Sequence, residues 1–159
     1  MTARLIATLA GVGLLRPAPG TWGSLAALPL GWAVMQAGPV VFTLAVLLVL
    51  PLGWWATTQV TAGQAEHDPS EVVIDELLGQ WIALLPLAWG AANAGVPVER
   101  LWPGWVAAFV LFRLFDIWKP GPVGTMDRRH DAWGVMLDDA VAGVFAAIGV
   151  VVLAALAHL

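Results

Sequence analysis

Residues 40–57 read VVFTLAVLLVLPLGWWAT, eighteen consecutive residues without a charged side chain. A helix of about 20 apolar residues crosses the hydrocarbon core of a bilayer. Two further stretches meet this standard, residues 77–97 and residues 139–158. These three stretches predict an all-α integral membrane protein, because a helix satisfies all its backbone hydrogen bonds within one spanning segment.

Two weaker segments complete the expected bundle. Residues 101–117 are long enough to span, but Arg113 and Asp116 near their end are costly in lipid unless they face protein or water. Residues 24–37 cover only about 21 Å at about 1.5 Å per residue, so a short tilted span, a half-helix and a re-entrant piece all stay open. We therefore predict a helical bundle of about four to five membrane segments in a single domain, residues 1–159.

The composition excludes several other classes of protein. Hydrophobic residues make up 60% of the chain and charged residues 11%, against about 45–50% and about 25% in soluble domains. The net charge of −4 and the lack of a basic run argue against a nucleic-acid partner. The absence of cysteine excludes disulfides, thiolate metal sites and cysteine nucleophiles. We expect the N-terminal segment to form an uncleaved interfacial helix that Pro17 and Pro19 stop.

The charges fall on one side of the predicted bundle. If every segment crosses, residues 1–23, 58–76 and 118–138 share a side, and six of the seven Lys and Arg residues lie there or beside it. Only Arg100 lies on the other side, so the positive-inside rule makes the first side cytoplasmic. Ten of the eleven carboxylates lie there as well. Since acidic residues contribute little to topology, their concentration needs a chemical explanation.

Two acidic pairs stand at the starts of apolar segments. Asp75 and Glu76 precede the segment 77–97, where we expect Asp68 or Ser70 to cap a helix that would place Glu71 and Asp75 on one face. Asp138 and Asp139 open the last segment. The alternative for both pairs is a structural role, in which their negative charge stabilises the N-terminus of a helix.

A third cluster combines both signs of charge. Arg113, Asp116 and Lys119 recur at i, i+3 and would share a helix face, with Pro120 ending the helix. Oxygen-rich surroundings without cysteine favour Mg²⁺ or Mn²⁺ over zinc.

A short segment near the N-terminus adds a place for an anion. Residues 17–24 (PAPGTWGS) put Gly and hydroxyl residues at an expected helix start, whose backbone N–H groups can bind an anion. A plain N-cap at Thr21 or Ser24 is an equal alternative. The sequence thus offers carboxylates that could bind a cation, Lys and Arg residues that could bind an anion, and this turn. Their combination indicates metal-assisted phosphate chemistry on a lipid headgroup.

Four motifs in order, APGTWGSL (18–25), DPSEVVIDELLGQWIAL (68–84), FRLFDIWKPGPV (112–123) and GVMLDDAVAG (134–143), resemble the phosphatidylglycerophosphatase A family. The resemblance implies a bacterial inner-membrane, all-helical, Mg²⁺-dependent lipid phosphatase. Such an enzyme hydrolyses phosphatidylglycerophosphate to phosphatidylglycerol and inorganic phosphate. The family's acidic motif residues fall on Asp75, Glu76, Asp116, Asp138 and Asp139, and its basic one falls on Lys119.

This interpretation assigns expected roles. The metal ligands would be Asp75, Glu76, Asp138 and Asp139, and Asp116 would be a further ligand or the base that orients a water. The catalytic residues would be Asp75, Asp116, Lys119 and Asp139. The headgroup would be bound by Thr21, Gly23, Ser24, Arg113, Lys119 and Arg128.

Two other functions stay open at this stage. A small cation transporter or channel would line a pathway with carboxylates spread through the depth of the bilayer. A purely structural membrane subunit would tolerate neutral residues in their place. The expected partners are the lipid substrate and the bilayer, with a homo-oligomer left open.

Overall fold

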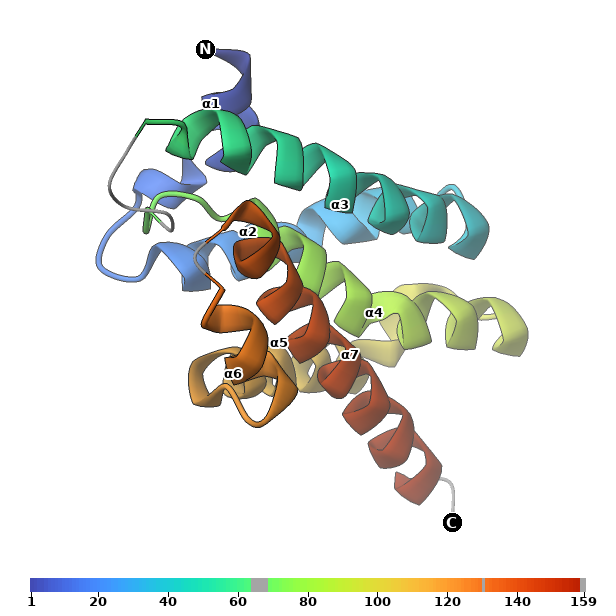
Figure 1. Ribbon diagram of the computed structural model, residues 1–159. Coiled ribbons are helices and arrows are strands. Elements are labelled where there is room, and N and C mark those ends of the chain that lie inside the picture. The colour runs from blue at the N-terminus through green and yellow to red at the C-terminus, as the bar shows by residue number, and fades with distance from the viewer. Residues whose placement is uncertain (64–68, 130, 158–159) are drawn as a thin grey trace.

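The computed structural model describes residues 1–63, 69–129 and 131–157 of the chain, and this part is helical without a strand. The elements in chain order are α1 (Thr2–Ala7), η1 (Val12–Leu14), α2 (Pro19–Met35), α3 (Pro39–Thr61), α4 (Ile74–Ala94), η2 (Val98–Leu101), α5 (Trp102–Trp118), α6 (Pro122–Asp127) and α7 (Ala132–Ala157). Here η marks a short 3₁₀ helix. The prediction of an all-α protein is confirmed (Figure 1).

Three helical stretches in the described residues are long and apolar enough to cross a membrane. They are α3, the run of η2 and α5 from Val98 to Trp118, and α7. They contain the expected segments 40–57 and 101–117 and most of 139–158. The expected span 77–97 falls largely in α4, which has 21 residues but is not one of the three. The short segment 24–37 belongs to α2, whose 17 residues cover about 25 Å at about 1.5 Å per residue.

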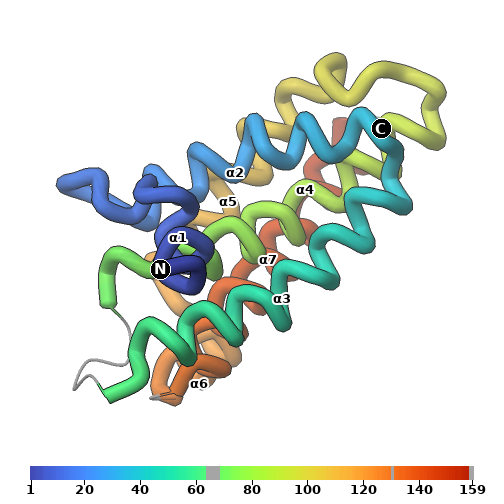
Figure 2. Tube along the Cα trace, turned by 90° about the horizontal axis from the view of Figure 1, so that it is seen from above, coloured from blue at the N-terminus to red at the C-terminus, as the bar shows by residue number. Residues whose placement is uncertain are grey.

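Helix α4 forms the centre of the bundle. It packs against α2, α3, α5 and α7 (Figure 2). Twelve of its 21 residues are buried, among them Leu78 and Leu84. The Trp81 indole donates a hydrogen bond to the carbonyl of Ala27 in α2, which ties the two helices together. The central helix thus carries Asp75 and Glu76 in its first turn.

Several expected helix boundaries at the N-terminal side are wrong. Helix α1 ends at Ala7, well before Pro17 and Pro19. Helix α2 begins at Pro19, so Thr21 and Ser24 lie inside it and neither is a cap. Proline fits the first turn of a helix because its missing N–H has no partner there in any case.

The starts of α4 and α7 also differ from expectation. Helix α4 begins at Ile74, so Ser70 does not cap it and Glu71 lies outside it, while Asp68 lies outside the described residues. Helix α7 begins at Ala132, with Asp131 accepting a hydrogen bond from the Gly134 N–H. The carboxylates at 138 and 139 therefore lie about two turns into α7 and do not cap it.

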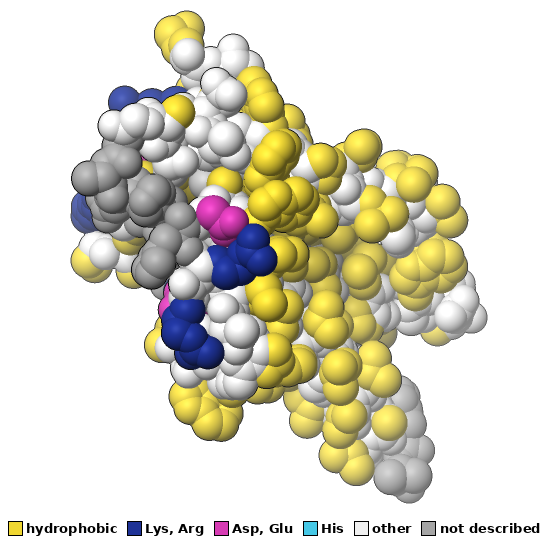
Figure 3. All heavy atoms as spheres, viewed as in Figure 1, with side chains coloured by type: hydrophobic (Ala, Val, Ile, Leu, Met, Phe, Trp, Pro, Cys, Tyr) yellow, Lys and Arg dark blue, Asp and Glu magenta, His cyan; other side chains and the backbone are white. Residues whose placement is uncertain are grey.

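Charged and apolar side chains separate along the molecule. In the view of Figure 3, Lys, Arg, Asp and Glu side chains gather at the end that carries α6 and the start of α7, while hydrophobic side chains cover the far parts of the bundle. Large apolar side chains such as Leu47, Leu48 and Ile148 are more than half exposed. Such a surface is typical of helices that face lipid.

Candidate active site

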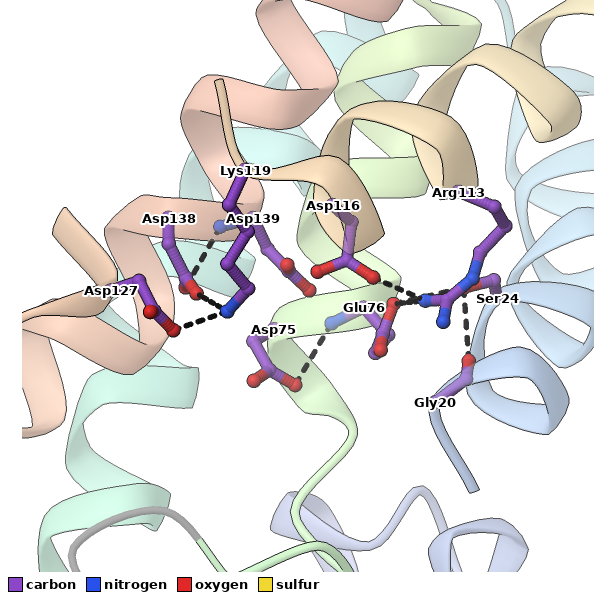
Figure 4. A network of polar contacts seen from close by, with 10 residues as sticks. All are labelled: Gly20, Ser24, Asp75, Glu76, Arg113, Asp116, Lys119, Asp127, Asp138 and Asp139. Carbon is purple, nitrogen blue, oxygen red and sulfur yellow. Dashed lines mark hydrogen bonds and ion pairs between the residues drawn. The ribbon is translucent and has the colours of Figure 1, made fainter. Parts of the chain in front are cut away.

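A cavity of about 320 Å³ opens at the polar end of the bundle. It lies between the first turns of α2 and α4, the end of α5 and the second turn of α7. Eight of the predicted site residues line it: Thr21, Asp75, Glu76, Arg113, Asp116, Lys119, Asp138 and Asp139. The fold therefore brings together residues that are up to 118 positions apart in the sequence, as Figure 4 shows for most of them.

Two glycines hold α4 and α7 close together beside this cavity. A Cβ atom on Gly143 would lie 2.4 Å from the carbonyl oxygen of Gly79, so the two backbones touch. Asp75 precedes Gly79 by four residues and Asp139 precedes Gly143 by four, so each carboxylate lies one turn from the contact on the same helix face. The contact thus places both carboxylates at the cavity.

Three carboxylates converge closely enough to share a cation. Ligand oxygens of Glu76, Asp116 and Asp139 all lie within 4.8 Å of one another. Asp139 is only 3% exposed, and its Oδ2 atom has no hydrogen-bond partner among the described residues. A buried carboxylate oxygen without a partner is costly, so this atom fits a position that a cation completes.

Arg113 is held by two of these carboxylates. Its Nη1 atom lies 2.6 Å from Glu76 Oε2 and 2.8 Å from Asp116 Oδ2. The Ser24 hydroxyl donates to the same Glu76 oxygen at 2.9 Å (Figure 4). The expected i, i+3 pairing of Arg113 with Asp116 is confirmed. The Arg113 guanidinium is thus engaged with carboxylates, and only 15% of its side chain is exposed.

Lys119 does not share the helix face expected for it. Helix α5 ends at Trp118, and Lys119 follows in the left-handed region with φ of 50°. Its ammonium lies 3.0 Å from Asp138 Oδ2 and also pairs with Asp127, a residue of α6. Partial burial alone would lower the pKa of Lys119, but the hydrogen bonds to Asp127 and Asp138 outweigh this and raise it above the ordinary value.

Gly20 lets α2 approach the carboxylates. A Cβ atom at this position would lie 2.1 Å from Glu76 Oε1, and 3.4 Å from an Arg113 nitrogen. Gly23 serves a related purpose, because a Cβ there would lie 2.8 Å from the Val73 side chain. The small residues of the PGTWGS segment therefore permit close helix packing at the site, and the first turn of α2, with Gly20 and Thr21, lines the cavity as the expected helix start.

Three of the predicted substrate-binding residues lie away from the cavity lining. Arg128 donates to the hydroxyl of Thr125 in α6, and Gly23 and Ser24 stand behind the lining. Two residues of the site, Gly20 and Asp127, are missing from the prediction. The glycine contact between α4 and α7 was also missed, although Gly79 and Gly143 each precede an alanine by four residues, a spacing common where membrane helices pack.

Comparisons with known proteins agree along almost the whole chain. The family model described as phosphatidylglycerophosphatase A matches residues 5–154. A phosphatidylglycerophosphatase A of Escherichia coli is 40% identical over 146 residues, covering 90% of this chain and 78% of that protein. One from Haemophilus influenzae is 38% identical over 146 residues, covering 91% and 83%.

A third relative carries a different name. It comes from Bacteroides thetaiotaomicron, is 41% identical over 150 residues, and covers 91% of this chain and 88% of its own. Its name is that of a phosphatidylinositol-3-phosphatase. No solved structure matches the chain.

Proposed function

This chain belongs to the phosphatidylglycerophosphatase A family, and we propose that the cavity at its polar end is the active site. The enzyme is a phosphoric monoester hydrolase that acts on phosphatidylglycerophosphate in phosphatidylglycerol biosynthesis. The observation that carries the assignment of the site is the convergence of Glu76, Asp116 and Asp139 within 4.8 Å.

The charge of the cavity supports a requirement for a divalent cation. Five carboxylates line it, against the two cations Arg113 and Lys119, so carboxylates exceed cations by three. A phosphomonoester adds about −1.5 to −2 charges near neutral pH. Such a group would be repelled by this cavity unless a cation neutralised it.

The donor atoms fit Mg²⁺. Magnesium prefers carboxylate oxygens and keeps several waters, and Glu76, Asp116 and Asp139 offer three oxygens from three different helices. An Mg²⁺ ion held by these residues would supply polarisation of the phosphoryl group and activation of a water for attack. Asp116 is one of these proposed metal ligands. The sequence analysis allowed it to be either a ligand or the base that orients a water. Asp75 and Asp138 line the same cavity and are proposed as further carboxylates for the ion and its waters.

The two cations have different proposed roles. Arg113 keeps Glu76 and Asp116 in place through its ion pairs and so preorganises the ligand set. Lys119 is 32% exposed at the cavity and is the cation that meets the substrate phosphate. An ammonium there stabilises negative charge on the phosphoryl oxygens during transfer to water. Thr21 also lines the cavity and is proposed as a further polar contact.

We also propose that the polar end of the bundle faces the cytoplasm. The charge distribution of the sequence supports a cytoplasmic position for the polar end in a bacterial inner membrane. A phosphorylated headgroup would then reach the carboxylates from the inner leaflet while its acyl chains stay in lipid.

A cation pathway is less well supported than a phosphatase. A pathway needs polar groups through the depth of the bilayer. All carboxylates in the described residues of α4, α5 and α7 lie toward the polar ends of their helices. The opposite halves of these three helices carry none.

The test is phosphate release by purified protein in detergent micelles, with and without Mg²⁺. Phosphatidylglycerophosphate and phosphatidylinositol 3-phosphate are compared as substrates, because relatives carry both names. Glu76→Gln and Asp139→Asn should abolish Mg²⁺-dependent release. Glu71→Gln is the matched control, since Glu71 pairs with Arg4 outside the cavity. Full activity of Asp139→Asn would refute the assignment of the site.

A further inference from the structure

A second cavity, of about 580 Å³, lies at the opposite end of the bundle. Its walls are the last turns of α4 and α7 and the first turns of α5, with apolar residues such as Leu87, Ala107 and Val150. Arg100 is the one charged residue among those that line it. The cavity has a simple origin: α4 and α7 touch at Gly79 and Gly143 and separate toward their C-termini (Figure 1).

An apolar cavity in this position needs an apolar occupant. Water would find few hydrogen-bond partners there, and an empty space would forfeit dispersion contacts. The volume lies within the range of about 300–1,000 Å³ that ligand pockets occupy. A helix from a second copy is about 10–12 Å across with its side chains, so this space would take in only about one turn of it. A flexible acyl chain fits better.

Arg100 supplies a matching polar contact at the rim. It belongs to η2, immediately before α5, and its side chain is exposed. Within the described ranges, Arg100 has no carboxylate at ion-pair distance. The neighbouring carboxylate, Glu99, accepts a hydrogen bond from the Trp32 indole instead. A guanidinium presents paired N–H donors that match the oxygens of a phosphate.

We propose that this apolar cavity, called the groove below, binds one diacyl phospholipid. An acyl chain would lie between α4, α5 and α7, and the headgroup phosphate would pair with Arg100. An anionic headgroup is favoured over a zwitterionic one, since the ammonium of the latter would lie near the guanidinium. The site is separate from the acidic cavity and does not depend on the function assigned to that cavity. The bound lipid occupies the leaflet opposite the acidic cavity.

Lipid binding to delipidated protein, measured by native mass spectrometry without Mg²⁺, tests the proposal. The probes are dioleoyl phosphatidylmethanol, which is anionic, dioleoyl phosphatidylcholine, which is zwitterionic, and dioleoylglycerol, which lacks the phosphate. The unaltered protein should bind the anionic lipid most tightly. Arg100→Gln should weaken that binding about tenfold or more and leave dioleoylglycerol unchanged. Arg129→Gln, at the other end of the molecule, is the matched control.

Variants that fill the groove with a larger side chain test the proposal independently. A Cβ on Gly90 has its nearest neighbour at 3.9 Å, so Gly90→Leu can extend into the space, and Ala154→Phe fills it from α7. Both should reduce binding of all three lipids while phosphatase activity in micelles persists. Unchanged binding in Arg100→Gln, or in both filled variants, would overturn the proposal. Efficient cross-linking of Ala154→Cys in vesicles, in a chain without other cysteines, would assign the groove to a second copy instead.

Discussion

Gly143 of α7 rests on the backbone of Gly79 in α4, so closely that a Cβ atom on Gly143 would lie 2.4 Å from the Gly79 carbonyl oxygen. One turn away on each helix are Asp139 and Asp75, both lining the acidic cavity. A Cβ on Gly79 would in turn meet the Asp139 carbonyl oxygen at 2.6 Å. The close approach of these two helices therefore sets the spacing of the carboxylates.

Gly143→Ala should separate the helices and lower activity. The added methyl group meets backbone, which cannot move aside cheaply, and overpacking of this kind costs about 1–3 kcal/mol. We expect a lower melting temperature and a higher Mg²⁺ concentration for half-maximal activity. Gly149→Ala is the control on the same helix, because its methyl group meets only the end of the Leu111 side chain. Equal behaviour of the two variants would contradict the role given to the contact.

Asp116→Asn should weaken Mg²⁺ binding. Asp116 is one of the three carboxylates within 4.8 Å, and an amide oxygen lacks the negative charge that holds the ion. Loss of groups that merely support a metal ligand costs about 10–100-fold in affinity or activity, and we expect at least that loss here. Mg²⁺ titration of phosphate release measures it. A variant that binds Mg²⁺ normally but turns over slowly would make Asp116 the base instead.

Arg113→Gln should destabilise the protein and make it more dependent on Mg²⁺. The substitution leaves Glu76 and Asp116 without the cation between them, and breaking a buried ion pair costs about 3–5 kcal/mol. Because Mg²⁺ can neutralise the same carboxylates, the ion should raise the melting temperature of the variant more than that of the unaltered protein. An identical Mg²⁺-induced shift in both would argue against this coupling.

The charge on Lys119 should persist well into the alkaline range. Its hydrogen bonds with Asp127 and Asp138 raise its pKa above the ordinary 10.5, so the stabilisation they give is complete below that value and is lost only as the pH rises through the higher one. Asp127→Asn removes one carboxylate and should move the alkaline decline of activity to lower pH. Arg128→Gln, at the neighbouring residue that donates to Thr125 rather than pairing with Lys119, should leave the pH profile unchanged.

Gly20→Ala should damage the site without unfolding the chain. A methyl group at this position would lie 2.1 Å from Glu76 Oε1 and push that carboxylate away from its partners. We expect a loss of activity of about 100-fold, the scale on which small misplacements of reacting groups act, and a lower melting temperature, because the buried ion pair of Glu76 with Arg113 would be disturbed. Normal activity would show that Glu76 can shift without consequence.

The sequence by itself determined the class of protein and pointed to the acidic residues that line the cavity. Uncharged stretches such as residues 40–57 leave a membrane-spanning helix as the stable state of the backbone, because lipid offers it no other hydrogen-bond partners. Carboxylates at the edges of such stretches are costly unless they serve a site. For this reason Asp75, Glu76, Asp116, Asp138 and Asp139 could be named in advance, and all five line one cavity.

Only the tertiary structure decided which of these groups meet. Glu76, Asp116 and Asp139 converge because α4, α5 and α7 cross at particular heights, fixed by contacts such as the one between Gly79 and Gly143. The sequence placed Lys119 on a helix face with Asp116, whereas the helix ends before it and the ammonium turns to Asp138. Periodicity reports the neighbours of a residue within its own helix, while contacts between helices depend on packing of surfaces that lie far apart along the chain.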